Sequence, residues 1–493
     1  MQHRPGKPDS PARTSRSGLE SILVNTGYLT ATRITAGLSR GIYALMLAAY
    51  LGPELYGLFN YGNSWYLLLV PIATLGIDRY LVREIGRNTQ NARCLINRTL
   101  GARIAAGAAI ILLSFMLARL VEDVPANRAV LYAFSFALLG RSLFIWVTSV
   151  LNAYETTRFV FVIESLFRIG EVAIGIILLI AEASLLYIVL LHTISWLTQA
   201  IAGLLYVNRH MFRLSISLDL ASLGNLLKRG APFLLSALFL NWILQGPLVL
   251  FRHLAHDEQQ LGQLALVMQA FFIIGTILSE AGNAALPVLS RSVRTENDHA
   301  QRFIDATLRL GILMGSLLVV CGLTIAEPLI AGILGDHYAV TANLLPYALA
   351  LVAPYFWLFT LNSLMVAHGH FWRHAMIGLG GAIGFSLASP LLWYLQALGA
   401  ILATATGLTL TLGLLLFILS KKHHIAFVRS IVQLAVTLGS GMVASLALQE
   451  AQPFLALFLA VIATLCAAVL SRVIRPAELS ALRAQLRRMP ADH

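Results

Sequence analysis

Three arginines lie inside long apolar stretches of this sequence, where a charged side chain is costly. Arg33 and Arg40 belong to "TRITAGLSRGIYALMLAAYLG" (32–52), and Arg141 lies about midway along the apolar stretch 129–152. A guanidinium in hydrocarbon costs at least about 3 kcal/mol. Arginine suits phosphate, because its planar fork donates two parallel hydrogen bonds. The three residues therefore indicate either pairing with buried acids or a cationic cavity for an anionic substrate.

Arg33 and Arg40 share one face of their predicted helix. Residues seven apart on an α-helix are displaced by only about 20°. Thr26, Thr30 and Gly37 fall on the same stripe, so this helix has one polar, small-residue face. The glycines alone are equally consistent with close helix packing.

A third basic group, Arg168, lies between Glu164 and Glu171, at i−4 and i+3, so the three side chains share a helix face. Two interpretations stay open: a self-neutralising ion-pair stripe, or a polar wall that lines a water-filled path. Glu164, Glu171 and Glu280 are also the acids with which Arg33, Arg40 and Arg141 would pair. Our candidate substrate-binding residues are Arg33, Arg40, Arg141 and Arg168.

Amide side chains also occur at mid-span depth, chiefly Asn241 and Gln245, which are one helical turn apart beside Trp242. Such groups suit either a sugar-binding cavity or hydrogen bonds between helices. Candidates for a polar cavity wall or for ion coupling are Glu164, Glu171, Asn241, Gln245 and Glu280; His192, Gln199, Asn283 and Asn362 are further polar groups at this depth.

Other arginines lie close to predicted span ends. Arg79, Arg103 and Arg309 are near the predicted cytoplasmic ends and Arg119 is near an outer end. We expect them to extend to the membrane surface.

The whole chain must provide membrane helices to carry these groups. It has 493 residues, 58% hydrophobic and 12% charged, with a mean hydropathy of +0.77. Recurring apolar runs of about 20 residues are typical of a polytopic all-α membrane protein. Hydropathy predicts fourteen spans, near 21–49, 58–82, 99–121, 129–152, 159–181, 185–207, 231–253, 261–289, 304–326, 340–367, 375–394, 399–420, 430–449 and 454–472.

The distribution of basic residues predicts the topology. Alternate connectors, including both tails, hold 25 of the 35 lysines and arginines, whereas the opposite connectors hold only Arg128 and Arg252. By the positive-inside rule both termini are cytoplasmic, in an inner (cytoplasmic) membrane. The connectors are too short for a catalytic or nucleotide-binding domain, so we expect no enzyme, no cofactor and no metal site. Basic residues in short loops also exclude a nucleic-acid interface.

The pattern repeats across two halves. Gly57 opens a span that reaches Gly76 and a basic loop, and Gly262 opens another that reaches Gly282, at offsets of 205 and 206 residues. Two six-span repeats are typical of transporters that bind substrate between repeats. The predicted organisation is a disordered cytoplasmic tail (1–20), an N-terminal six-helix half (21–207), a cytoplasmic linker (208–230), a C-terminal six-helix half (231–420), helices 13 and 14 (421–472) and a cytoplasmic tail (473–493).

The segments "AAYLGPELYGLFNYGNSW" and "PIATLGIDRYLVREIGR" resemble the polysaccharide-transporter family, the Wzx-type O-antigen and exopolysaccharide flippases of the multidrug/oligosaccharidyl-lipid/polysaccharide (MOP) exporter superfamily. The residues that match its pattern are Leu51, Gly52, Pro53, Tyr56, Gly57, Leu75, Gly76, Ile77 and Asp78. "AALPVLSR" (284–291) and "EPLIAGILGDHY" (327–338) resemble second-half markers of the same family.

The resemblance implies a flippase that moves an undecaprenyl-pyrophosphate-linked oligosaccharide across the cytoplasmic membrane by alternating access, without ATP hydrolysis. It also implies coupling to H⁺ or Na⁺ and cooperation with polysaccharide polymerase or assembly machinery. Three alternatives remain: a multidrug antiporter, a lipid II flippase for peptidoglycan, and a polysaccharide polymerase or ligase. The excess of buried basic over acidic residues disfavours the first, and the small outer connectors disfavour the last.

Overall fold

The computed structural model describes residues 18–87, 92–217, 219–255, 257–293, 297–367, 370–448 and 452–474. These residues form α-helices and one short 3₁₀ turn, without a strand among them. The helices are α1 (Gly18–Thr74), α2 (Asp78–Arg87), α3 (Ala92–Val121), α4 (Pro125–Ala153), α5 (Thr157–Ile180), α6 (Leu185–His210), α7 (Leu220–Leu254), α8 (Glu258–Val293), α9 (Asn297–Leu334), α10 (Ala339–Ala350), α11 (Val352–Ala367), α12 (Phe371–Ala388), α13 (Leu391–Ser420), α14 (Phe427–Ala447) and α15 (Pro453–Leu470).

The predicted all-α membrane fold is confirmed. Within the described part of the chain, eleven helical segments are long and apolar enough to cross a membrane. Each of the fourteen predicted spans overlaps a helix, although the boundaries differ at four places. The first two spans are joined in α1, the second continues into α2, the tenth is divided between α10 and α11, and the eleventh continues from α12 into α13. The segment predicted as a linker (208–230) is partly helical, because α6 ends at His210 and α7 begins at Leu220.

The junction inside α1 explains the first family motif. Gly52 has φ 69° and ψ 172°, so the helix breaks there and restarts at Pro53. Glycine adopts positive φ without a Cβ clash, and proline is favoured in the first helical turn, where its missing N–H leaves no bond unmade. The Leu-Gly-Pro sequence thus divides α1 into a first part (18–51) and a second part (53–74).

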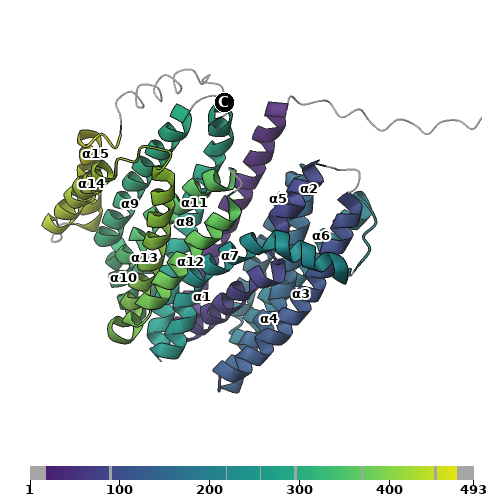
Figure 1. Ribbon diagram of the computed structural model, residues 1–493. Helices are drawn as coiled ribbons and strands as arrows, with labels where there is room; N and C mark the ends of the chain where they lie inside the picture. Colours follow the sequence, from purple (N-terminus) through teal and green to yellow (C-terminus); the bar gives the residue numbers. More distant parts are fainter. Residues whose placement is uncertain are drawn as a thin grey trace, which may run out of the picture.

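Figure 1 shows two groups of helices, with α2–α6 on one side and α9, α13, α14 and α15 on the other. In the first group α4 packs against α3 and α6; in the second, α12 packs against α13 and α7, and α9 against α10, α14 and α15. The two parts of α1 lie between the groups and contact α5 and α4 on one side and α8 and α7 on the other. The two halves therefore meet along α1, α7 and α8.

Where the two halves meet, two contacts join residues that occupy equivalent positions in the two sequence repeats. Gly57 faces Gly262 so closely that a Cβ on Gly57 would lie 2.8 Å from the Gly262 amide nitrogen. Nearby, Gln259 Nε2 donates to Glu54 Oε1 at 3.4 Å. Both pairs are 205 residues apart, which is the repeat offset. A residue in contact with its own equivalent lies close to the axis that relates the two copies, so this axis passes close to Gly57 and Gly262.

The close approach at this axis leaves no space for a methyl group on α8. We expect Gly262→Ala to lower the free energy of unfolding by about 1–3 kcal/mol, the usual cost of overpacking, because its Cβ would fall on the backbone carbonyl of Pro53. The measurement is unfolding of the purified protein in mixed micelles. Gly413→Ala in α13 is the matched control, since no atom lies within 4 Å of its Cβ position. An effect of Gly262→Ala no larger than that of the control would contradict the close contact.

Candidate functional site

A polar cluster lies inside the N-terminal half, between α4, α5, α6 and the second part of α1. On α5, Arg168 Nη1 lies 2.8 Å from Glu171 Oε2, and on α6, His192 Nδ1 lies 2.6 Å from Glu171 Oε1. Arg168 Nη2 also donates to Gln199 Oε1 at 3.1 Å. Arg168, Glu171 and Gln199 are buried, with at most 6% of each residue exposed. One carboxylate thus joins a guanidinium and an imidazole in a site that excludes water.

The contacts of His192 define its protonation. Trp196 Nε1 can only donate a hydrogen bond, and it lies 3.1 Å from His192 Nε2. Nε2 is therefore the acceptor nitrogen, and the proton is on Nδ1, where it is donated to Glu171. The Tyr66 hydroxyl lies 3.2 Å from the same Nε2. The imidazole is neutral in this arrangement, and a second proton on it would oppose the Trp196 donor.

Arg141 is the third charged group of the cluster and lies near the middle of α4. Its Nη1 donates to the Tyr66 hydroxyl at 3.4 Å, and its guanidinium lies 4.7 Å from the centroid of the Trp196 ring. The Arg168 guanidinium lies 4.1 Å from the same ring. Among the described residues no carboxylate forms an ion pair with Arg141. Two guanidiniums, one carboxylate and a neutral imidazole leave the cluster with one excess positive charge.

The structure separates the members of the predicted acidic and basic stripe on α5. Arg168 pairs with Glu171, as in the self-neutralising interpretation. Glu164 is half-buried and forms no ion pair with any residue that the structure describes. The Arg40 side chain is exposed on the first part of α1, whereas the side chains of Arg33 and Glu280 lie outside the described set.

Asn241 and Gln245 lie at the contact between the halves rather than beside Arg141. Asn241 Nδ2 donates to the carbonyl oxygen of Leu67 at 3.0 Å, and Gln245 Oε1 accepts from Ser64 Oγ at 2.9 Å. These are hydrogen bonds between α7 and the second part of α1, the interhelical alternative that the sequence left open. They hold the two halves together at mid-span depth.

The same contact continues toward the predicted outer end of the molecule. The Tyr61 hydroxyl lies 3.0 Å from His253 Nε2, and Arg252 Nε lies 3.5 Å from Glu122 Oε2. Arg252 also pairs with Glu258. Polar contacts thus follow α1 and α7 along much of their shared length.

The structure corrects the expectation for Arg103. Its side chain is fully buried and does not extend to a membrane surface. Arg103 Nη2 lies 2.6 Å from Asp78 Oδ1, and Arg103 Nη1 donates to the Ser142 carbonyl at 2.8 Å. Asp78, the last residue of the Leu-Gly-Ile-Asp motif, therefore neutralises a buried arginine and ties α2 to α3.

Sequence reasoning did not connect His192, Trp196 and Tyr66 to the charged residues. His192, Trp196 and Gln199 are spaced i, i+4 and i+7 on α6, which places them on one helix face. That spacing is visible in the sequence and is the signal that would have identified this face of α6. Tyr66 carries no comparable signal, because it lies in an apolar run of α1.

Comparisons with known proteins agree with this architecture. The model of a family described as "Polysaccharide biosynthesis protein" matches residues 22–293, more than half of the chain. No curated protein matches the chain.

Several solved structures share the fold. The lipid II flippase MurJ, in an inward closed conformation, superimposes with a TM-score of 0.70 at 13% identity, over 92% of this chain and 100% of that one. A MOP superfamily transporter from Pyrococcus furiosus gives 0.53 at 13% identity, over 83% and 99%. The eukaryotic MATE transporter AtDTX14 gives 0.51 at 12% identity, over 81% and 96%. At these identities the likeness concerns the fold alone.

Proposed function

The chain belongs to the polysaccharide biosynthesis protein family, and from this premise we propose that it transports a lipid-linked oligosaccharide across the membrane. The substrate would be an oligosaccharide on undecaprenyl pyrophosphate, used for O-antigen or exopolysaccharide synthesis. Transport would take place in the cytoplasmic membrane, with both termini inside. The proposal describes a transporter and no catalysed reaction.

The observation that carries the proposal is the excess positive charge at Arg141. Arg168 is neutralised by Glu171. Among the described residues, the polar partner of Arg141 is the Tyr66 hydroxyl, and its guanidinium otherwise lies against the rings of Tyr66 and Trp196. A guanidinium that is kept near the middle of a membrane helix without an acid needs another reason to be there. A pyrophosphate supplies one, because it accepts the paired hydrogen bonds that a guanidinium donates.

Movement of the polar headgroup requires the halves to part. The bonds from Ser64 to Gln245 and from Asn241 to the Leu67 carbonyl would break on one side of the membrane at a time. Gly57 and Gly262, close to the repeat axis, suit a pivot for that motion. This is alternating access between two rigid halves.

The His192 imidazole supplies a means of coupling to a proton gradient. A proton added to Nε2 would convert it from acceptor to donor, and would expel the Trp196 N–H and turn the Tyr66 hydroxyl. Tyr66 contacts Arg141 directly. Protonation of His192 would thereby change the hydrogen bond of Arg141, the residue proposed to hold the pyrophosphate. Glu171 would stabilise the resulting imidazolium.

The test is transport by the full-length protein in liposomes. A fluorescent undecaprenyl-pyrophosphate oligosaccharide in the inner leaflet should appear at the outer surface faster than in protein-free liposomes, and an imposed proton gradient should change the rate. Lipid II is included as a competing substrate, because MurJ, a lipid II flippase, has the same fold. Rates equal to those of empty liposomes under every gradient would refute transport, and a preference for lipid II would assign the substrate differently.

A further inference from the structure

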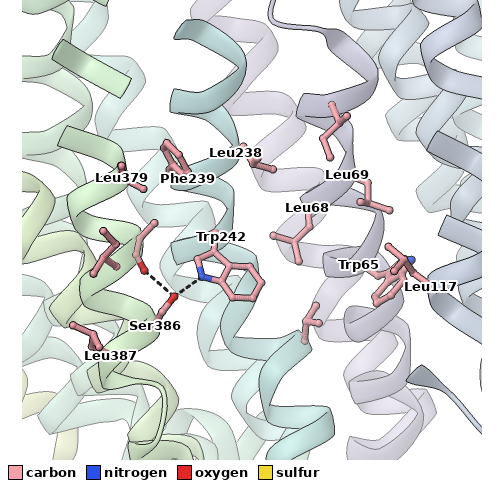
Figure 2. Close-up of a pocket in the computed structure, with 14 residues that line it drawn as sticks. Trp65, Leu68, Leu69, Leu117, Leu238, Phe239, Trp242, Leu379, Ser386 and Leu387 are labelled. Carbon is pink, nitrogen blue, oxygen red and sulfur yellow. Dashed lines mark hydrogen bonds between the residues drawn. The ribbon is translucent and has the colours of Figure 1, made fainter. Parts of the chain in front are cut away.

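An apolar groove lies where the second part of α1 faces α7. Its volume is about 590 Å³, and Ser386 is the only one of its lining residues that is neither aliphatic nor aromatic. Figure 2 shows lining side chains from three helices, with α1 on one side, α7 in the middle and α12 on the other side. The residues labelled on these helices are Trp65, Leu68 and Leu69 of α1, Leu238, Phe239 and Trp242 of α7, and Leu379, Ser386 and Leu387 of α12. The Ser386 hydroxyl already has a hydrogen-bond partner within the groove wall, because it accepts the Trp242 N–H at 2.9 Å. The groove therefore offers hydrocarbon contacts and no free polar partner.

The groove marks one of two seams between the halves. At the other seam, the first part of α1 packs on α8, and a Cβ at Gly41 or Gly37 would lie 3.4 or 3.5 Å from Ile273 or Ile277. At these two described positions the isoleucine side chains pack directly on α1. The α1–α7 seam contains the groove, and the hydrogen bonds Ser64–Gln245 and Leu67–Asn241 join the same two helices. A lipid-linked substrate must leave its hydrocarbon chain in the membrane at one of these seams.

Basic side chains lie beyond one end of the groove. Arg79 follows Ile72 of the groove wall by seven residues, and its guanidinium lies 5.8 Å from the ring centroid of Phe233, six residues before Phe239 on α7. Arg79 is exposed, and its neighbour Asp78 forms an ion pair with Arg103. On α7, Arg229 donates to the Tyr80 hydroxyl at 2.9 Å. Among the described residues neither arginine forms an ion pair with an acid.

We propose that this groove binds the polyprenyl chain of the substrate before transport, with the pyrophosphate on Arg79 and Arg229. The inference rests on the proposed function and adds to it the place where the carrier lipid docks. The supporting observation is complementarity. A groove lined by apolar side chains, with two arginines farther along α2 and α7 that form no ion pair among the described residues, matches a hydrocarbon chain that ends in an anionic pyrophosphate. The pyrophosphate docks at the predicted cytoplasmic end of the seam, the side from which the proposed transport starts.

The arrangement also orders the first steps. Arg79 contacts Phe233 of α7, whereas Arg141 contacts Tyr66 and Trp196 inside the N-terminal half, so the two arginines belong to different sites. The hydrogen bonds of Asn241 and Gln245 to α1 must open before the headgroup can pass between the halves, while the chain stays in the groove. Docking and translocation are therefore separate events that different variants should affect.

The test uses full-length protein in nanodiscs and undecaprenyl pyrophosphate without sugar, carrying a photoreactive group in its chain. Crosslinks should map to groove peptides of α1, α7 and α12. Arg79→Gln should weaken binding about tenfold, the scale of one charge-assisted hydrogen bond. Ile383→Trp should lower the crosslinking yield by filling the groove from a half-exposed position. Arg119→Gln and Leu166→Trp, both exposed and outside the groove, are the matched controls and should bind as wild type.

Wild-type binding in both groove variants, crosslinks on other helices, or equal competition by phosphatidylglycerol would overturn the inference. The experiments distinguish a failure of the transport proposal from a failure of the docking proposal. If the protein binds the carrier in an Arg79-dependent way but moves no oligosaccharide, the docking groove stands and the transport proposal falls. If it transports oligosaccharide and the groove variants bind and transport normally, the groove assignment alone is wrong.

Discussion

Replacing Glu171 with glutamine is expected to lower the free energy of unfolding by about 3–5 kcal/mol, the usual cost of breaking a buried ion pair. The change removes the charge that neutralises Arg168, whose side chain is only 7% exposed. It also weakens the acceptor of the His192 Nδ1–H, which lies 2.6 Å from Glu171 Oε1. Reversible unfolding in mixed micelles, followed by tryptophan fluorescence, measures the difference.

The same helix offers a matched control in Glu164→Gln. Glu164 is half-buried and forms no ion pair with described residues, so this change should alter the free energy of unfolding by less than about 0.5 kcal/mol. The double variant of Arg168→Gln with Glu171→Gln should recover part of the loss, because no isolated charge is then left buried. Equal stabilities for Glu171→Gln and Glu164→Gln would mean that water reaches the Arg168–Glu171 pair.

Replacing Arg141 with glutamine is expected to lower the rate of oligosaccharide transport at least about tenfold, the loss that follows from one charge-assisted hydrogen bond to phosphate. The physical reason is that Arg141 carries the excess positive charge of the cluster. Stability should change little, because no described carboxylate would be left unpaired. Initial rates in the liposome assay, together with unfolding of the same preparations, separate the two effects.

Arg141→Lys refines this result, since it keeps the charge and loses the planar fork. We expect an intermediate rate, because an ammonium acts on phosphate as a point charge without paired hydrogen bonds. Arg158→Gln is the matched control: Arg158 is exposed in the first turn of α5, and this variant should transport at the wild-type rate. Normal transport by Arg141→Gln would remove Arg141 from the substrate path.

The sequence alone predicted the elements and their order. Apolar length is a local property, so every predicted span overlaps a helix, although some helix boundaries differ from the predicted ones. The Leu-Gly-Pro motif corresponds to the break at Gly52, because glycine and proline act on the backbone at their own positions. The family resemblance is confirmed by the family match to residues 22–293. The pairing of Arg168 with Glu171 was also accessible, since i and i+3 are neighbours on any helix.

Only the tertiary structure decided which groups from different helices meet. Asp78 neutralises Arg103 across two helices, Asn241 and Gln245 bond to α1, and His192 joins Glu171 to Tyr66. In a soluble helix the apolar stripe indicates the face that packs inward, but a membrane helix is apolar on its lipid-facing side as well. Periodicity therefore cannot say which helix lies opposite a given residue. Helix packing supplies that information, and with it the unneutralised charge of Arg141 and the groove between α1 and α7.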